Sequence, residues 1–465
     1  MNAPMIWIIV PAFIGILLML VANQRALSVI GGLTAVVLAL TAQFIPIEEA
    51  FGVGILSFRI ESSLNVLGRS LQIQAQEGTL LALIYGAAAL WFFGAEAAGT
   101  ARKLVPVGLM ITALMVAAIA VEPFLFAALF IEMTVLLSVP MLTSLYTPPG
   151  KGVLRFLIYQ TLAMPFLLLS GWLLAGVEAS PGNLTLAAQS ASILGLGFAF
   201  LFAIFPLYSW IPMLLEEAPP FTVGFLLWLI PTITVIFGAG FIDRYSWLRS
   251  SPQLTTTLQF AGAVMVVTGG LWAAFQRHIG RIMAYGAIAE TGFSLLALSL
   301  DLRFGASVLF LLLPARALAL AVWSLSLSIL KNNSETMRFR SVRGMIRAFP
   351  FASAGLVIAS LSTSGFPLLA GFPARLALWD LLARASLGTA LWMGIGIAGL
   401  FVTSFRTLAV LSMADEYTSW GVGEDRLQGI MLGLGVIGLF ILGIFPQTLQ
   451  YFLADLPGMF EHLGR

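Results

Sequence analysis

Two carboxyl groups and one guanidinium group lie within long apolar stretches of this sequence. Glu132 is found in FLFAALFIEMTVLLSVPML, Glu290 in MAYGAIAETGFSLLAL, and Arg375 in AGFPARLALWDLL. Carboxyl groups buried in apolar surroundings can exchange protons near neutral pH, whereas arginine keeps its proton in proteins. Glu132 and Glu290 are therefore candidate proton-relay groups, and Arg375 is a candidate fixed charge of the same relay.

Three further ionisable residues lie in apolar segments and are candidates for interhelical ion pairs: Arg316, Asp380 and Arg406. Ionisable groups inside a membrane cost about 2.5–3.5 kcal/mol each on insertion scales, so we expect each to have a function or a partner. For Glu290, a relay role and an ion pair are both open. The two histidines are too few for a histidine-rich site, and we expect no bound metal.

Two segments share the pattern F-P-L-x-x-x-x-P. Each proline removes a backbone hydrogen bond and disfavours a straight helix. Matching breaks in the two halves of a chain are typical of the midplane pathway of transporters, although prolines are also common kinks in membrane helices. We interpret four prolines as hinges: Pro206 and Pro212 in the first segment, and Pro367 and Pro373 in the second.

The composition indicates that these residues belong to a membrane protein. Of the 465 residues, 60% are hydrophobic and only 9% are charged, against about 25% charged in soluble domains. The absence of cysteine excludes disulfides and iron–sulfur ligation by this chain. The net charge of +2, without a basic stripe, excludes nucleic acid as a partner. We predict an all-α, multi-pass protein of the inner (cytoplasmic) membrane with no cofactor of its own.

A spanning helix needs about 20 mostly apolar residues, and this rule predicts about fourteen transmembrane helices in a single domain, 1–465. The segment 47–77 is too polar to span and alternates like a β-hairpin outside the membrane. The spacing of the proline breaks fits two five-helix repeats, 105–242 and 256–413. The predicted spans are 5–22, 26–46, 78–96, 105–121, 123–146, 153–176, 189–214, 221–242, 256–275, 279–299, 303–330, 352–385, 388–413 and 427–451.

The loop charges predict an orientation. Most Lys and Arg residues lie in loops that follow odd-numbered predicted spans, including the basic segment KNNSETMRFRSVRGMIRAFP. Because cytoplasmic loops are richer in Lys and Arg, both termini are predicted to lie outside. The start, MNAPMIWIIVPAF, lacks a basic region and is interpreted as the first span rather than as a cleaved signal.

Four stretches resemble motifs of the antiporter-like membrane subunits of respiratory complex I, a family with relatives in Mrp-type antiporters and membrane-bound hydrogenases. They are LFIEMTVLLSVPML, FPLYSWIPMLLEEAPP, QRHIGRIMAYGAIAETGF and STSGFPLLAGFPARL. The resemblance covers nearly the whole chain and is nearer to the M- and N-type subunits than to the L type, which has an additional lateral helix. It implies fourteen core helices, inverted five-helix repeats, broken seventh and twelfth helices and external termini. It also places Glu132 at the motif glutamate of the fifth helix, and Arg375 at a relay position where relatives have lysine or glutamate.

The sequence departs from the family at a position tied to ion transport. Relatives have a lysine five residues before the seventh-helix proline, where this chain has Leu201, and no lysine occurs between Lys151 and Lys331. Two accounts follow. Either the chain has lost this half-channel and couples its neighbours structurally, or the route runs through Glu132, waters and Glu290. The sequence favours the first account for the half-channel that contains Leu201 and leaves the second half open.

The resemblance implies a membrane-arm subunit of an ion-translocating, NADH:quinone oxidoreductase-like complex whose redox centres lie in other chains. The expected partners are further membrane and redox subunits and the lipid bilayer. Two alternatives stay open: a subunit of an Mrp-like cation/proton antiporter, and a non-transporting scaffold in a hydrogenase-type complex. An antiporter would be expected to carry more acidic groups near the breaks than this chain does.

Overall fold

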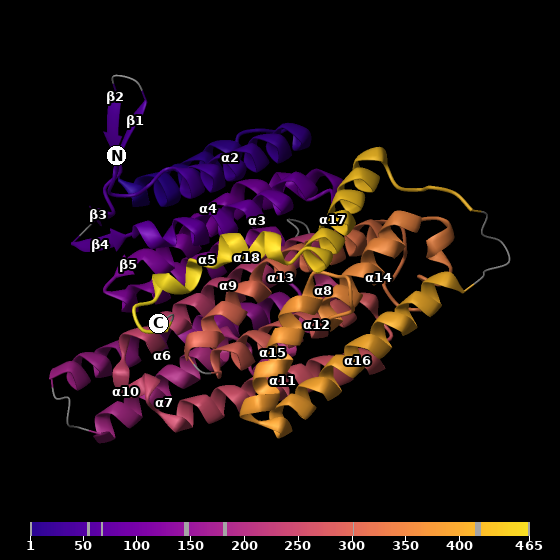
Figure 1. The fold of residues 1–465 in the computed structure, drawn as a ribbon. Coiled ribbons are helices and arrows are strands. Elements are labelled where there is room, and N and C mark those ends of the chain that lie inside the picture. Colours follow the sequence, from indigo (N-terminus) through magenta and orange to yellow (C-terminus); the bar gives the residue numbers. More distant parts are fainter. Residues whose placement is uncertain are drawn as a thin grey trace.

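The structure, a computed structural model, is a bundle of long helices (Figure 1). It describes residues 2–53, 56–66, 68–143, 148–179, 184–300, 302–413 and 420–463. Within these residues ten helices are long and apolar enough to cross a membrane. Three shorter apolar helices accompany them, at Met5–Leu18, Thr185–Leu201 and Pro350–Ser364. The prediction of an all-α, multi-pass membrane protein is confirmed, and the count of fourteen spans stays a prediction.

The helices are α1 (Val10–Leu18), α2 (Gln24–Phe44), α3 (Gly78–Ala97), α4 (Ala101–Ala120), α5 (Ala127–Leu142), α6 (Lys151–Ala179), α7 (Leu184–Leu201), α8 (Trp210–Glu217), α9 (Pro220–Arg244), α10 (Ser246–Arg249), α11 (Pro252–Phe275), α12 (Ile279–Leu298), α13 (Leu302–Asn332), α14 (Pro350–Ser364), α15 (Gly371–Ala385), α16 (Leu387–Ser412), α17 (Arg426–Ile444) and α18 (Gln447–Leu453).

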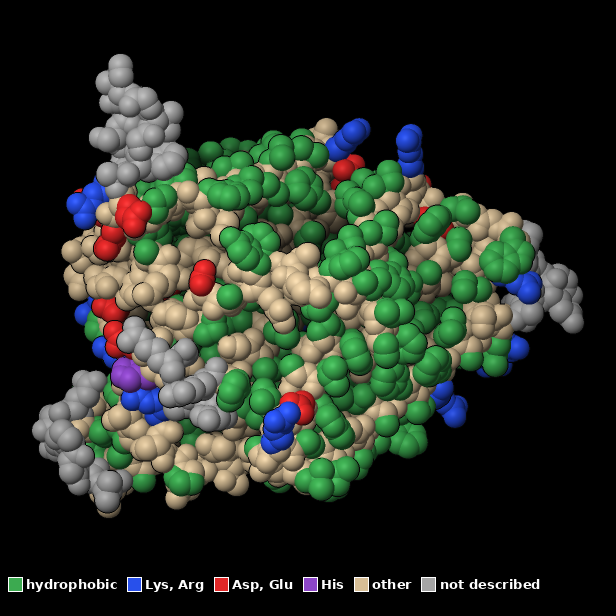
Figure 2. Space-filling model, in the orientation of Figure 1, with side chains coloured by type: hydrophobic (Ala, Val, Ile, Leu, Met, Phe, Trp, Pro, Cys, Tyr) green, Lys and Arg blue, Asp and Glu red, His purple; other side chains and the backbone are tan. Residues whose placement is uncertain are grey.

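Two helices, α9 and α13, form the centre of the bundle. They are mostly apolar and buried on nearly all sides, which is typical of helices enclosed by others, and α13 packs against α9, α12, α14, α15 and α17. The outer helices instead expose large apolar side chains, including Leu33 on α2 and Ile437 on α17. Figure 2 shows such a face: hydrophobic side chains cover its middle, and most charged side chains lie toward its edges. An apolar outer surface of this extent fits contact with lipid or with other membrane subunits.

The segment 47–77 contains two antiparallel strand pairs, which lie near the N-terminus in Figure 1. The first pair joins β1 (Ala50–Val53) to β2 (Leu56–Arg59), and the second joins β3 (Ser63–Val66) to β4 (Arg69–Gln72). Strand β4 also pairs with β5 (Val121–Glu122), which follows α4 directly. Both termini lie at this end of the bundle (Figure 1).

Both segments that carry the F-P-L-x-x-x-x-P pattern are interrupted helices. In the first, α7 ends at Leu201, Ala203 has a φ of +52°, and α8 begins only at Trp210 after a 3-10 turn. In the second, α14 ends at Ser364 and α15 begins at Gly371, with Leu368 at a φ of +71°. Positive φ at a residue with a side chain is uncommon and is concentrated at functional sites. Each break therefore combines a proline with a strained non-glycine residue.

Candidate functional site

A buried ion pair joins α12 to α15. The Nη2 group of Arg375 donates a hydrogen bond to Oε1 of Glu290, and the two residues are only 4% and 3% exposed. The Arg375 guanidinium carbon lies 3.8 Å from the centroid of the Phe293 ring, which adds a cation–π contact. The structure thus brings together two of the three predicted relay residues, which are 85 positions apart in the sequence.

The second break shapes the position of Arg375. Gly365 adopts the left-handed φ of +79°, and a Cβ atom at this residue would lie 2.9 Å from Cγ of Arg375. Arg375 Nη2 also approaches the carbonyl oxygen of Thr363 at 3.5 Å, near the end of α14. A glycine is required here both for the backbone angle and for the close approach of the arginine stem.

Arg316, on the central helix α13, lies beside this pair. It is 1% exposed, and its Nη2 group donates to the Leu227 carbonyl at 2.9 Å and to Thr291 Oγ1 at 3.2 Å. The Leu227 carbonyl is available because Pro231, four residues later in α9, has no N–H to donate. Among the described residues, no carboxylate lies within ion-pair distance of Arg316, but the charges of Glu290 and Arg375 act on it electrostatically.

Leu201 ends α7 and is 2% exposed. Its carbonyl oxygen and that of Phe200 accept hydrogen bonds from Nε2 of Gln160 on α6, both at 3.4 Å. Its side chain lines a cavity of about 20 Å³ between the first break and the second half of the bundle. The same cavity is lined by Gln160, Trp210, Thr291 and Arg316.

Glu132 lies on α5 and faces α6. Its Oε1 atom accepts a hydrogen bond from Thr161 Oγ1 at 2.9 Å, whereas its buried Oε2 atom has no hydrogen-bond partner within the described part of the chain. Glu132 is not among the residues found to line the Leu201 cavity. Among the described residues, no hydrogen bond or ion pair joins Glu132 to Glu290 or Arg375.

The other two candidate ion-pair residues lie away from this site. Asp380 is on the exposed side of α15, where its side chain is 57% exposed and bonds to Arg384 one turn later at 2.9 Å. Arg406 on α16 lies over the ring of Phe339, with 5.6 Å between the guanidinium carbon and the ring centroid. An ion pair is thus present at Asp380, but its partner is on the same helix.

The sequence interpretation missed a polar cluster at the outer end of α8. Glu216 Oε2 accepts a hydrogen bond from Nη2 of Arg281 at 2.7 Å, and Glu216 Oε1 lies within ion-pair distance of Arg281 Nε, at 2.7 Å, and of His278 Nε2, at 3.9 Å. Lys331 donates to the Ala218 carbonyl at 2.9 Å. Burial lowers the pKa of His278, and the positive charges of Arg281, Lys331 and Arg338 act in the same direction against the opposing charge of Glu216. The EEAPP sequence at the end of the motif FPLYSWIPMLLEEAPP was the available signal.

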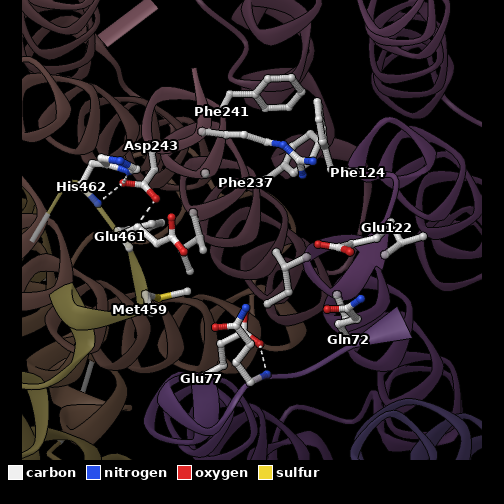
Figure 3. A pocket seen from close by; sticks show the side chains of 18 residues that line it. Gln72, Glu77, Glu122, Phe124, Phe237, Phe241, Asp243, Met459, Glu461 and His462 are labelled. Carbon is white, nitrogen blue, oxygen red and sulfur yellow. Dashed lines mark hydrogen bonds and ion pairs between the residues drawn. The ribbon is translucent and has the colours of Figure 1, made fainter. Parts of the chain in front are cut away.

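A second polar region lies at the opposite end of the bundle, the end that carries both termini, and residues near the C-terminus line it (Figure 3). This pocket of about 390 Å³ is lined by Glu77, Glu122, Asp243, Glu461 and His462, among others. The Asp243 carboxylate accepts backbone N–H groups of residues 461 to 463 at 2.8–2.9 Å, so it anchors the C-terminal segment. Within the described residues, no group of three or more acidic, histidine or cysteine side chains could hold a metal ion.

The chain matches known proteins over most of its length. The family described as "NADH:quinone oxidoreductase/Mrp antiporter, TM" matches residues 125–403, which is more than half of the chain. NADH-quinone oxidoreductase subunit N of Dehalococcoides mccartyi is 27% identical over 303 residues, 60% of each chain. Subunit N of Cytophaga hutchinsonii is 22% identical over 262 residues, 56% of each chain. The alignments thus span a little over half the length of these curated relatives.

Solved structures share the fold across nearly the whole chain. A chain of an archaeal membrane-bound sulfane sulfur reductase superposes with a TM-score of 0.81 at 17% identity, covering 98% of this chain and 96% of the other. A chain of Thermus thermophilus complex I gives 0.77 at 20% identity and 99% coverage of both. A chain of the Mrp complex from Dietzia gives 0.77 at 16% identity, with 98% and 97% coverage. From the sequence match and this shared fold, the chain belongs to the NADH:quinone oxidoreductase/Mrp antiporter membrane-subunit family.

Proposed function

We propose that the chain is a membrane-arm subunit of a multi-subunit, ion-translocating oxidoreductase, and that partner chains carry the redox centres. The observation that carries this proposal is the buried charge cluster of Glu290, Arg375 and Arg316 inside a fold shared with complex I over nearly the whole chain. The lack of cysteine in the sequence supports redox chemistry in other chains.

The half-channel of the first break is impaired in this proposal. Leu201 presents an apolar side chain to the cavity beside the break, so this position has no group that could bind and release a proton. The interrupted helix and its positive-φ residue are nevertheless retained. The chain would then keep the hinge architecture of Pro206, Pro212, Pro367 and Pro373 and contribute to coupling between neighbouring subunits.

In this proposal, a proton route is left only to the protonatable groups elsewhere in the molecule. Glu132 has one buried carboxylate oxygen without a hydrogen-bond partner in the part of the chain that the structure describes, and a hydroxyl donor on the other, which suits a proton-relay group. Glu290 can take part only when its bond to Arg375 loosens, because the guanidinium occupies its Oε1 atom. Arg375 acts as the fixed charge of this pair.

Two other functions have specific support. The fold is shared with an Mrp complex chain, which favours a cation/proton antiporter subunit as the first alternative. The fold also occurs in a chain of the sulfane sulfur reductase, an archaeal respiratory membrane complex, which is compatible with the second alternative, a non-transporting scaffold subunit of a membrane-bound hydrogenase-type complex. Both alternatives retain assembly with other membrane subunits.

Purification from the native membrane tests the proposal. The tagged chain is expected to co-purify with subunits that carry flavin or iron–sulfur clusters, detected by their absorbance and by mass spectrometry. The isolated chain is then reconstituted in liposomes with a pH gradient. Cation-dependent proton exchange by the chain alone, without such partners in the native preparation, would contradict the assembly and favour the antiporter.

A further inference from the structure

The cavity beside the first break has room for a single small molecule. Its volume is about 20 Å³, and a cavity needs roughly 10–15 Å³ of this kind to hold one water molecule. Both halves of the chain line it, with Gln160, Leu201 and Trp210 from the first half and Thr291 and Arg316 from the second.

The polar atoms around this cavity match one water molecule. Gln160 Oε1, Trp210 Nε1 and the Nε and Nη1 atoms of Arg316 are all buried and have no hydrogen-bond partner among the residues described. Buried polar atoms of this kind are nearly always satisfied in folded proteins, by protein groups or by ordered water. A water molecule can accept a hydrogen bond from Arg316 and donate one to Gln160 Oε1.

The cavity also faces a permanent positive charge. Arg316 keeps its proton, and Glu290, the carboxylate that acts on it, is itself bonded to Arg375. These three side chains together carry one net positive charge in the bundle interior. A second cation in the same cavity would meet this charge in a medium of low dielectric constant, where like charges repel far more strongly than in water.

We propose that this cavity binds one water molecule between Gln160 and Arg316. We also propose that it is a single-cation site: Arg316 is the one cation it accommodates, and a second positive charge is excluded. The fixed charge of Arg316 then requires a neutral neighbour, and Leu201 is that neighbour. A proton that enters from the first half of the chain meets this permanent positive charge, as at the positive constrictions of selective pores. The proposal rests on the proposed function, because it treats Leu201 as part of an impaired half-channel, and it adds a reason why that position is neutral.

A double-mutant cycle on the purified full-length chain tests the single-cation site. Leu201→Lys is expected to lower the midpoint of thermal unfolding in detergent by at least about 5 °C in the wild-type background. In the Arg316→Met background the same substitution should lower the midpoint by less than half as much, because the introduced lysine is then the only cation at the cavity. Equal shifts in both backgrounds would overturn the proposal.

A matched control separates this coupling from the general cost of a buried lysine. Leu194 is buried on α7, two turns before Leu201, and is not among the residues that line the cavity. Leu194→Lys is expected to shift the midpoint equally in both backgrounds. If Leu201→Lys yields no folded protein, recovery of folded chain in the Leu201→Lys/Arg316→Met double variant supports the proposal, and failure to recover contradicts it.

The water molecule is tested by an experimental structure of the full chain in lipid, at a resolution that shows ordered water. One density peak within hydrogen-bond distance of Gln160 Oε1 and Arg316 is expected. A dry cavity, or a continuous row of waters along Leu201, would overturn this site. Neither measurement depends on partner subunits or on proton pumping. The single-cation site can therefore fail its test while the proposed function stands, and the proposed function can fail while the site stands.

Discussion

At the scale of single residues, α15 takes part in two arginine–carboxylate pairs in opposite environments, one with Glu290 of α12 and one within the helix itself. Arg375 and Glu290 are enclosed by the bundle, whereas Asp380 and Arg384 lie on its outer surface. Removing one partner of a buried pair leaves an uncompensated charge in the interior, which is strongly destabilising. Exposed pairs contribute little, because solvent screens both charges.

Glu290→Gln is therefore expected to destabilise the chain by about 3–5 kcal/mol. The matched surface change, Asp380→Asn, should alter stability by no more than about 1 kcal/mol. Thermal unfolding of the two purified variants in the same detergent measures the difference. Similar losses for both variants would show that the Glu290–Arg375 pair is not a buried interior contact.

Glu132 differs from Glu290 because no arginine or lysine holds it within the described residues. Its contact with Thr161 preserves a hydrogen bond in either protonation state, since a hydroxyl can donate or accept. Such a site suits a proton-exchanging group better than a salt-bridged carboxylate does.

Glu132→Gln is expected to reduce proton pumping by the intact complex without dissociating it, because glutamine retains the hydrogen bond but cannot exchange a proton. The readout is the proton-to-electron ratio in proteoliposomes, with subunit content checked on a native gel. Glu335→Gln, on the exposed basic loop, is the control and should leave the ratio unchanged. A normal ratio in Glu132→Gln would leave this residue a structural role only.

At the scale of elements, α8 is a short half-helix held at both ends. Its inner end, with Trp210, borders the Leu201 cavity, and its outer end is bonded through Glu216 to Arg281 at the start of α12. His278 caps α12, because its Nδ1 atom accepts the backbone N–H of Arg281 at 3.3 Å. This cap requires an unprotonated Nδ1, in agreement with the lowered pKa of His278.

The His278 cap predicts a pH dependence of stability. Because the pKa of His278 is lower in the folded chain than its ordinary value of 6.5, the unfolded chain binds more protons at mildly acidic pH. The contribution of His278 is complete above pH 6.5 and is lost as the pH falls through the folded-state pKa. Thermal unfolding of wild type and His278→Asn between pH 8 and pH 5 is the measurement. The variant should lose less stability on acidification, and parallel curves would contradict the cap.

At the scale of the whole molecule, the two ends of the bundle differ in charge. The end that carries the termini has the acidic pocket with Glu77, Glu122, Asp243 and Glu461. The opposite end has clefts lined by basic side chains: Arg102, Lys103 and Lys331 in one, and Arg277, Arg281, Arg338 and Arg340 in the other. The contacts of Glu216 with Arg281 and of Lys331 with the Ala218 carbonyl join the two basic clefts.

This asymmetry predicts that the basic end faces the cytoplasm and the termini face outside. The chain has no cysteine, so a single introduced cysteine reports one position. Glu61→Cys should react with a membrane-impermeant maleimide in intact cells. Arg340→Cys, on the basic end, should react only after the membrane is opened. The reverse pattern would show that the orientation is inverted.

Sequence alone determined the class of this protein and the places where its helices break. Apolar length and proline chemistry act locally, so the bundle class and the interruptions around Pro206 and Pro367 could be predicted without tertiary contacts. The glycine at position 365 and the pairing of Arg316 with the carbonyl freed by Pro231 are consistent with the sequence but were not predicted from it.

Only the tertiary structure decided which charges meet. A helix that is apolar on all sides carries no amphipathic pattern, so its rotation in the bundle cannot be derived from its own residues. Packing turns Arg375 inward to Glu290, whereas Asp380, five positions later and therefore on a different face of the same helix, lies outward with Arg384. The same packing brings Arg316 and Leu201 to one small cavity, a relation between distant segments that depends on three-dimensional contact.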